Sequence, residues 1–205
     1  MLEVSGAGIS MVTGTGNRGV VCATDDRAAR IEDLQLTVGV GPCIDAIATG
    51  GPVLLPDLAA PGGVDTSRWL GFTADVRRAG VEAVFAFPLR IGAITLGAID
   101  LYRDTPGDLS AAQLAAALLA ADTAAIALLH INTSGDEAFE ANPQSRADYR
   151  LQVHQATGMV AEQLKVSLDV ALLRLRGHAF STGRTLSDVA DDVIIRRLRF
   201  TPEEP

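Results

Sequence analysis

Three kinds of side chain in this sequence could do chemistry: arginines in the last third, a cysteine behind a Gly-Pro pair, and an aspartate inside an apolar run. Arg174, Arg176 and Arg184 carry planar guanidinium groups, which donate two parallel hydrogen bonds to a phosphate and stack on flat rings. Cys43 could be a redox or ligand-contacting thiol, although burial as a small apolar residue is the commoner role of a lone cysteine. Asp100 must lie at a loop edge, pair with an arginine or line a pocket, because an uncompensated buried carboxylate is costly.

The arginines lie on different sides of the helix that must position them. On a helix that begins at Leu168, Arg174 lies about 240° and Arg176 about 80° around the axis. The two therefore flank the apolar stripe on opposite sides and cannot form one compact patch, and their stems could simply cover apolar surface. Attraction to the C-terminus of a helix is the simpler explanation for three later arginines, Arg196, Arg197 and Arg199.

The length, composition and charge of the chain predict a folded protein whose two parts differ in net charge and in role. Its 205 residues allow one large domain or two small ones, and 48% hydrophobic against 20% charged residues describes a folded chain. The net charge of −8 is uneven, since residues 1–142 hold 8 Lys and Arg against 17 Asp and Glu, whereas residues 143–205 hold 9 against 8. An acidic body therefore precedes a nearly neutral, arginine-bearing tail.

The composition argues against several classes of protein and site. Cys22 and Cys43 form no disulfide framework, and three scattered histidines give no Cys/His cluster at zinc-ligand spacing, so we expect no metal and no cofactor. The N-terminus lacks the basic and apolar regions of a secretory signal. Residues 111–131 draw their apolarity from alanine and include Asp122, which disfavours a membrane span. We expect a cytoplasmic protein with no membrane partner.

The first 105 residues predict strands separated by turns. The clearest β signal is the pair 81–89 and 94–102, whose nearly continuous apolar residues predict a hairpin in the middle of an antiparallel sheet covered on both faces. Residues 24–36 form a polar segment. Shorter elements are predicted elsewhere: strands at 8–12 and 20–23, a helix at 43–49 and a strand at 53–55.

The rest of the chain is predicted to be helical. Ser110 and Gln113 form a capping box that opens a helix to residue 131, with an apolar stripe at Leu114, Leu118, Ala121, Ala125 and Leu128. Its alanines favour close approach of another helix, in the same domain or in a second subunit. Three more helices follow from Asn142, the second capped by Ser167 and the third by Thr185. The stripe of the second is Leu168, Ala171, Leu172, Leu175 and Ala179.

The tail resembles the ANTAR domain, the three-helix RNA-binding module of bacterial antitermination regulators, over residues 147–200. The resemblance rests on residue order across the three helices: Arg150, Val153, Ala156, Thr157 and Gly158, then Ala171, Leu175 and Arg176, then Gly183, Leu186, Val189 and Ala190. The first part resembles a GAF sensor domain. This resemblance rests on four runs: VGVGPCIDA at 38–46, GPVLLPDL at 51–58, VFAFPLR at 84–90 and LGAIDLY at 96–102.

The two resemblances imply an α+β fold in two domains. An antiparallel-sheet, GAF-like sensor without its usual N-terminal helix would span 1–131, a linker 132–143, and a small all-α, three-helix ANTAR-like domain 144–205. They imply a homodimer, not an enzyme, that binds tandem hexaloop RNA hairpins in nascent transcripts and prevents transcription termination. An unknown small molecule or protein would be the signal. The expected RNA-binding residues are Arg150, Ala156, Thr157, Gly158, Arg174, Arg176 and Arg184, and the expected pocket residues are Cys43, Phe87 and Asp100.

Thr157 departs from the ANTAR pattern, and Gly158 has two possible explanations. Thr157 stands where many ANTAR domains carry a lysine, so one phosphate contact expected for the family is missing. Gly158 costs about 1 kcal/mol within a helix relative to alanine. It allows either close approach of an RNA backbone or tight packing of the first tail helix against the second or against a partner subunit, and packing is the favoured explanation.

Two other functions remain as alternatives. A GAF-type free-methionine sulfoxide reductase would use Cys22 and Cys43 as pairing thiols, but it leaves the helical tail unexplained. A DNA-binding helix-turn-helix factor would need a base-reading helix, whereas the last helix carries Asp188, Asp191 and Asp192, which repel phosphate.

Overall fold

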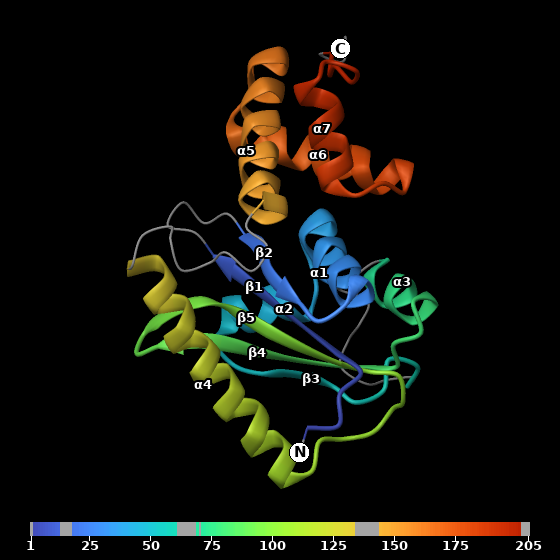
Figure 1. Ribbon diagram of the computed structural model, residues 1–205. Coiled ribbons are helices and arrows are strands. Elements are labelled where there is room, and N and C mark those ends of the chain that lie inside the picture. Colours follow the sequence, from blue (N-terminus) through green and yellow to red (C-terminus); the bar gives the residue numbers. More distant parts are fainter. Residues whose placement is uncertain (1, 13–17, 61–68, 70, 134–143, 202–205) are drawn as a thin grey trace. The chain divides into compact units, whose positions relative to one another are not determined.

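The computed structural model describes residues 2–12, 18–60, 69, 71–133 and 144–201, with side chains omitted at 18, 131–133 and 144–151. The chain divides into two compact units (Figure 1). The first contains Met1–Gln35 and Val40–Glu140, and the second contains Leu36–Gly39 and Ala141–Pro205.

The first unit is built on a five-stranded sheet in which every neighbouring pair is antiparallel, in the order β2-β1-β5-β4-β3. The strands are β1 (Gly6–Val12), β2 (Arg18–Ala23), β3 (Val53–Leu55), β4 (Ala83–Ile91) and β5 (Ile94–Arg103). The predicted central hairpin is confirmed as β4 and β5, which pair from Ala83 with Arg103 to Ile91 with Ile94. Gly92, with φ 60°, forms the turn between them.

Both faces of the sheet are covered, as the apolar runs predict. Helix α4 (Ala111–Thr133) packs on one face, where alternate residues of β4 such as Phe85 and Phe87 join its alanines in one core. Helices α1 (Asp26–Val38), α2 (Pro42–Thr49) and α3 (Phe72–Arg78) belong to the opposite face (Figure 1). The apolar part of the core there includes Val84, Trp69 and Tyr102. The two faces therefore hold separate sets of side chains.

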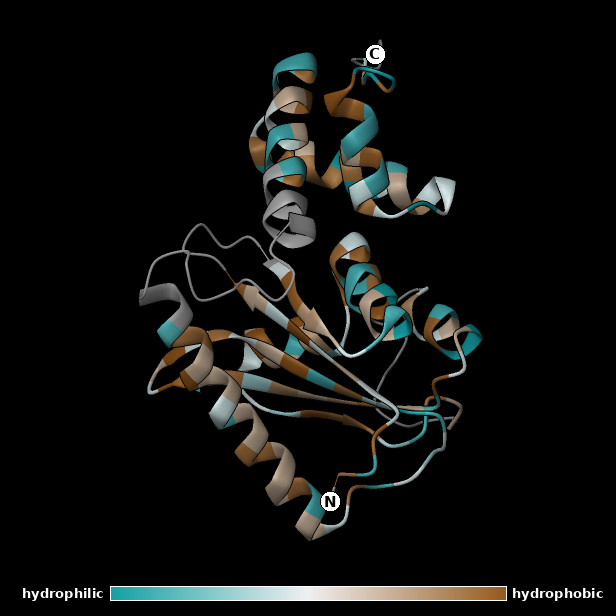
Figure 2. Ribbon diagram, viewed as in Figure 1, coloured by the Kyte–Doolittle hydropathy of each residue, from teal (hydrophilic) through white to brown (hydrophobic). Residues whose placement is uncertain are grey.

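Helix α4 begins with the predicted capping box, since Gln113 N donates to Ser110 Oγ and Ser110 N donates to Gln113 Oε1. The predicted stripe is wrong at Leu118, which is 44% exposed, while the sheet-facing residues are Ala117, Ala121, Ala125 and Leu128. Figure 2 shows why: α4 is apolar along most of its length. Residues Ala111–His130 are long and apolar enough by composition to cross a membrane, but the alanine stripe packs on the sheet as part of the core.

Helix α1 lies in the segment that the sequence presents as polar, and its existence was not predicted. Ala28 N donates to Asp25 Oδ1, which lowers the pKa of Asp25 and helps to begin the helix. Glu32 and Gln35, on its inner side, are fully buried. Because polar residues occupy buried positions, the helix lacks the apolar periodicity that would identify it.

The second unit is a three-helix bundle of α5 (Gln144–Leu164), α6 (Leu168–Thr182) and α7 (Leu186–Ile194). The predicted caps are confirmed, because Val170 N donates to Ser167 Oγ and Asp188 N donates to Thr185 Oγ1. The stripe of α6 is wrong at Leu168, which is 61% exposed. The fully buried residues of the bundle are Ala156, Val160, Ala171, Leu175, Ala179, Leu186, Val189, Ala190 and Val193.

Candidate functional site

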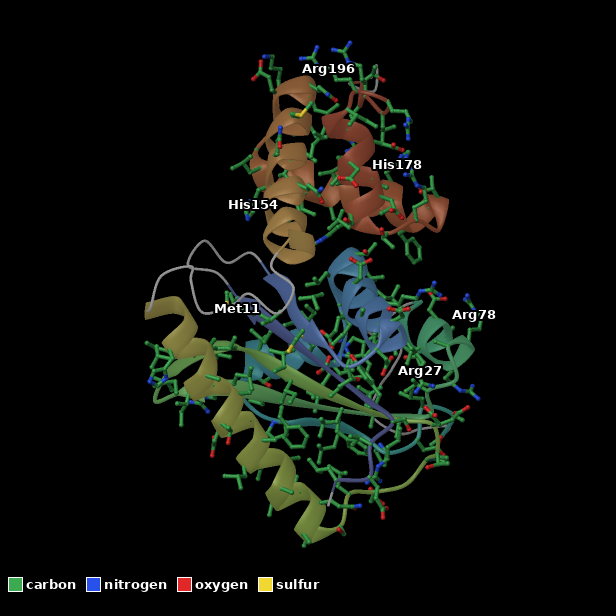
Figure 3. The ribbon with its side chains drawn as sticks, viewed as in Figure 1. Met11, Arg27, Arg78, His154, His178 and Arg196 are labelled. Carbon is green, nitrogen blue, oxygen red and sulfur yellow. The ribbon has the colours of Figure 1, made fainter. Side chains whose placement is uncertain are left out.

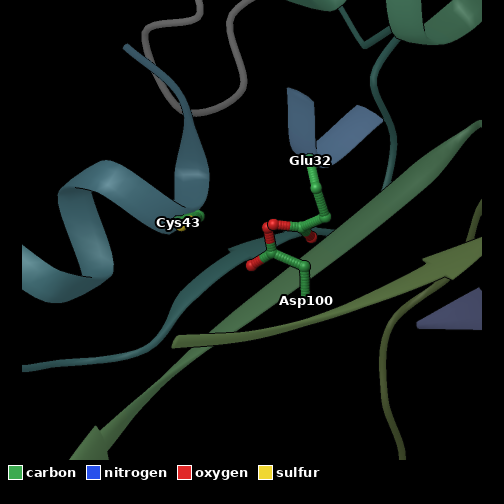
Figure 4. Close-up of side chains that lie close together, drawn as sticks. All are labelled: Glu32, Cys43 and Asp100. Atoms are coloured by element: carbon green, nitrogen blue, oxygen red, sulfur yellow. The ribbon is translucent and has the colours of Figure 1, made fainter. Parts of the chain in front are cut away.

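A cluster of buried polar residues lies in the first unit, on the side of the sheet opposite α4. It comprises Ser10 from β1, Glu32 and Gln35 from α1, Cys43 from α2, and Asp100 and Tyr102 from β5, each at most 1% exposed. We call these six residues the buried polar cluster. Figure 4 shows the side chains of Glu32, Cys43 and Asp100 close together. Buried polar groups are costly unless they are satisfied, so the contacts within the cluster decide its chemistry.

Hydrogen bonds hold the two carboxyl groups in place. Tyr102 Oη donates to Glu32 Oε1 at 2.6 Å, and Ser10 Oγ donates to Glu32 Oε2 at 2.5 Å. Gln35 Nε2 donates to Asp100 Oδ2 at 2.5 Å. The amide oxygen of Gln35 accepts from Cys43 N at 2.9 Å, which joins the start of α2 to the network. Four elements of the first unit therefore meet in one network.

Two glycines make room for these side chains. A Cβ at Gly8 would lie 2.4 Å from Glu32 Oε1, and a Cβ at Gly41 would lie 2.4 Å from Gln35 Oε1. The φ of 151° at Gly41 also lies where side-chain-bearing residues are rare. Any larger residue at either position would displace a polar group of the cluster. The backbone is thus shaped around Glu32 and Gln35.

The electrostatics of the cluster disfavour two ionised carboxylates. Burial raises the pKa of Glu32. Burial and then repulsion from Glu32 raise the pKa of Asp100 well above its usual value. Burial, followed by the nearby carboxylates, also raises the pKa of Tyr102. Neither Glu32 nor Asp100 forms an ion pair with an arginine or lysine among the described residues, so any compensating charge must be a proton or a bound cation.

The structure brings together only part of the predicted pocket. Cys43 and Asp100 meet in the cluster, but Phe87 lies in the core under α4, on the opposite face of the sheet. Of the three alternatives for Asp100, a loop edge and an arginine partner are wrong, because Asp100 is buried, accepts from Gln35 and forms no ion pair with a described arginine. Glu32, Gln35, Ser10 and Tyr102 were missed, and only a prediction of α1 as a helix facing the sheet could have found the first two. Partly buried Cys22 also packs on the α4 side, away from Cys43.

A shallow hollow of about 530 Å³ lies on the outer side of α5 in the second unit. It is lined by Gln155, Gly158, Met159, Glu162, Gln163, Arg196 and Arg199. No atom within 4 Å would meet a Cβ at Gly158. The favoured explanation of this glycine as a tight packing position within the bundle is therefore wrong, and Gly158 presents bare backbone to an exposed surface.

The arginines after α7 differ in what they contact. Arg197 Nη1 lies 2.9 Å from Asp192 Oδ1 and so belongs to an ion pair of the bundle. Arg196 and Arg199 are exposed and form no ion pair within the described part of the chain. Figure 3 labels Arg196 at the end of the bundle where α7 stops. Arg197 thus has an ion pair in addition to its place near the helix end, and attraction to the C-terminus of α7 stays a prediction for Arg196 and Arg199.

Arg196 also has an unusual backbone. Its φ is 60°, in the left-handed region, at the position after the C-cap of α7 where glycine is usual. Arg196 N donates to Val193 O and Leu198 N donates to Asp192 O, which ends the helix and turns the chain. A side chain there costs about 1–2 kcal/mol relative to glycine. Arg196 therefore occupies a strained backbone position.

The predicted RNA-binding residues are placed in different surroundings. Ala156 is fully buried, and Thr157 is 7% exposed and donates from Oγ1 to Val153 O, so both serve the bundle. Arg184 pairs with Asp192 at 2.8 Å, and this hydrogen bond lowers the pKa of Asp192. Gly158 faces the hollow. Arg150 lies in α5, and its side chain is outside the described residues.

The other two predicted arginines lie on α6. Arg174 is exposed and lines a different hollow of about 570 Å³, together with apolar residues such as Val170 and Leu173. Arg176 is half-buried. The structure therefore confirms that these arginines form no single patch, and it does not bring either of them to the hollow at Gly158.

Comparison with known proteins places both units in described families. A family model described as GAF domain matches residues 2–129, and one described as ANTAR domain matches residues 142–194. No curated protein sequence matches the chain.

Solved structures resemble the chain at low sequence identity. One is a domain of a putative two-component sensor histidine kinase protein from Sinorhizobium meliloti 1021, with 15% identity, a TM-score of 0.48, and 65% of this chain and 84% of that chain covered. Another is a type II free methionine-R-sulfoxide reductase from Thermoplasma acidophilum, with 17% identity, a TM-score of 0.45, and 62% and 80% covered. A third is the GAF domain of an Acinetobacter phosphoenolpyruvate-protein phosphotransferase, with 11% identity, a TM-score of 0.47, and 65% and 75% covered.

The matched ranges agree with the observed architecture. The antiparallel sheet and its helices coincide with the GAF match, and the bundle from α5 to α7 coincides with the ANTAR match. The chain therefore belongs to the GAF domain family and has the GAF-ANTAR architecture of a regulator, in which a sensor domain precedes an RNA-binding antitermination domain.

Proposed function

We propose that this chain is a cytoplasmic antitermination regulator whose C-terminal bundle binds tandem hexaloop RNA hairpins under control of the GAF domain. The observation that carries the proposal is the exposed surface at Gly158, where bare helix backbone lies in the same hollow as two arginines that form no ion pair with any described residue. An RNA backbone can approach a glycine closely, and guanidinium groups bind phosphates and stack on unpaired bases. In this proposal, Ala156, Thr157 and Arg184 do not contact RNA as expected but stabilise the bundle.

The balance of charge supports recognition by shape. The hollow also contains Glu162, which forms an ion pair with Lys165. With a nearly neutral tail, the bundle has no strong basic field, so a single site should bind RNA weakly. Two linked sites gain affinity through effective concentration, which is why tandem hairpins and a dimer belong together in the proposal.

The test compares binding of the full chain to paired hexaloop hairpins, to a single hairpin and to duplex DNA over a salt titration. We expect the paired hairpins to bind at least about tenfold more tightly than either competitor, because avidity needs two hairpins. Equal, weak binding to all three nucleic acids would reject the proposal.

The proposed homodimer uses the outer face of α4. Leu118, Leu119, Ile126 and Leu129 are 39–67% exposed on this helix, although the same helix also buries an alanine stripe against the sheet. Such a continuous apolar face fits a second copy of the same helix, since α4 directly precedes the segment that leads to the RNA-binding domain.

Leu119→Glu is expected to convert the dimer into a monomer, because two or more carboxylates would be buried at the helix–helix contact. Sedimentation velocity checks the result at micromolar protein. Ala93→Glu, which adds the same charge in the exposed β4–β5 turn, serves as the matched control and should remain dimeric. A Leu119→Glu protein that stays dimeric would place the interface elsewhere.

The enzyme alternative has less support. A reductase would need thiols that can pair, but Cys22 and Cys43 lie on opposite faces of the sheet. Free methionine-R-sulfoxide reductase activity is a property of the Thermoplasma protein, and its likeness to this chain concerns only the fold. The proposed role of the first unit is therefore to sense a signal.

A further inference from the structure

One oxygen of the buried polar cluster accepts no hydrogen bond from a donor among the described residues. Asp100 is 1% exposed, and its Oδ1 is among the buried atoms without a donor, while its Oδ2 accepts from Gln35. The adjacent group is the carboxyl of Glu32, which is itself an acceptor (Figure 4). A buried acceptor without a donor is unfavourable, so either a proton shared with Glu32 or a bound cation is needed at this place.

Cys43 supplies a third possible metal-ligand atom beside the two carboxyl groups. One ligand atom each from Glu32, Cys43 and Asp100 lies within 4.8 Å of the others, and all three residues are buried. Around a tetrahedral zinc ion, carboxylate oxygen and thiolate sulfur ligands lie about 3.5 Å apart. The three side chains need only small movements to reach that spacing. A proton shared between the two carboxyl groups is the alternative occupant of this place.

We propose that Glu32, Cys43 and Asp100 bind one zinc-class divalent cation in the core of the GAF domain. The donor set of one sulfur and two carboxylate oxygens suits zinc better than magnesium or calcium, which prefer oxygen alone. Three protein ligands leave a fourth position for water or another small ligand. Spacing in the sequence could not reveal this site, because its members come from α1, α2 and β5.

The surrounding residues orient the ligands as outer-shell partners do in metal sites. Tyr102 Oη and Ser10 Oγ donate to the two oxygens of Glu32, and Gln35 Nε2 donates to Asp100 Oδ2. Gly8 and Gly41 leave the space that Glu32 and Gln35 occupy. Such preorganisation is expected for a binding site, whereas a purely structural core would be cheaper to build from apolar residues.

Binding would tie two helices to the sheet. Glu32 lies on α1 and Cys43 on α2, while Asp100 lies on the central strand β5. A cation shared by the three would stabilise one arrangement of these elements over another. In this way the cation would act as the signal of the regulator. That role rests on the proposed function of the chain, whereas binding of the cation does not.

The test loads the full chain with zinc or cobalt ions. We expect one Zn²⁺ per chain by mass spectrometry after dialysis, and a thiolate-to-cobalt charge-transfer absorption with Co²⁺. Cys43→Ala should abolish that absorption and weaken zinc binding by more than the roughly 10- to 100-fold that an outer-shell change causes. Cys22→Ala, the matched control on the other face of the sheet, should retain both. Tyr102→Phe should lower zinc affinity roughly 10- to 100-fold and keep the absorption.

The outcomes separate this inference from the proposed function. Absence of stoichiometric zinc binding by the unmodified chain, or a cobalt absorption that Cys43→Ala leaves intact, overturns the metal site and leaves only a shared proton. Circular dichroism establishes that each variant is folded. Hairpin binding is measured separately without metal, so a chain that binds hairpins but no zinc refutes only the inference. A chain that binds zinc but no hairpins refutes only the proposed function.

Discussion

Combining Arg196→Gly with Arg199→Ala is expected to weaken binding of paired hexaloop hairpins by at least about a hundredfold. A hydrogen bond to a charged group contributes about 1.5–3 kcal/mol, and each 1.4 kcal/mol is tenfold in affinity. Because each lost phosphate contact removes about 0.7 from the salt slope for single strands, and a dimer on paired hairpins loses four contacts, the slope should fall by about 2.8. Fluorescence anisotropy with labelled RNA at several salt concentrations measures both quantities.

Arg196→Gly alone separates binding from folding. Glycine is the usual residue at the left-handed position after a helix, so this change relieves strain at φ 60° while it removes the guanidinium group. The gain is partly offset by the entropy of glycine in the unfolded chain. We expect the melting temperature of the bundle to be unchanged or slightly higher, together with an affinity for RNA about tenfold lower or more.

Arg197→Ala is the matched control for charge. It removes the same charge from the same turn, but Arg197 pairs with Asp192 and does not line the hollow. Its effect on RNA affinity should stay within about threefold, since only the long-range field changes. Equal losses in Arg197→Ala and Arg196→Gly would show that net charge, and not the surface at Gly158, governs binding.

Gly97→Ala is expected to have the largest effect on the stability of the GAF domain. A Cβ at Gly97 would lie 2.0 Å from Ser10 O and 2.9 Å from Met11 Cα, both backbone atoms of the neighbouring strand β1. Strand backbone cannot move aside without breaking the pairing of β1 with β5, so overpacking should cost about 3 kcal/mol. The melting temperature should fall by roughly 10 °C in a thermal scan followed by circular dichroism.

Gly51→Ala tests whether the close approach, and not the loss of a glycine, causes this effect. Its nearest atom to an added Cβ is Thr49 Oγ1 at 4.0 Å, and its backbone is not in the left-handed region. The melting temperature should stay within about 2 °C of the unmodified protein. A Gly97→Ala protein as stable as Gly51→Ala would mean that β1 and β5 do not approach as closely as the structure shows.

The elements that the sequence predicted are those with local signals. The caps at Ser110, Ser167 and Thr185 depend on side chains within three residues of the backbone groups that they satisfy. The β4–β5 hairpin joins two apolar runs across a turn with a glycine. In contrast, α1 was missed because its buried face includes Glu32 and Gln35, the residues that make the cluster distinctive.

The prediction of site residues was wrong where it depended on which face of the sheet or of the helix a residue occupies. Phe87 and Asp100 are both buried in neighbouring strands, but they point to opposite sides of the sheet. Gly158 was expected to be packed but is exposed, because helical spacing alone cannot distinguish a packed glycine from an exposed one. Neither choice depends on residue type, so neither could be made without the positions of the other elements.

By itself, the sequence determined the two-domain architecture through its resemblance to GAF and ANTAR domains. It determined the central hairpin, the caps at Ser167 and Thr185 and the uneven distribution of charge through residue type and local spacing, whereas the expected cap Asn142 lies outside the described residues. Only the tertiary structure decided that Glu32, Cys43 and Asp100 meet, and that Arg196 and Arg199 flank an open Gly158. The physical reason is that contacts between residues distant in the chain depend on which faces pack together. That choice is settled by the burial of the whole core and not by any single segment.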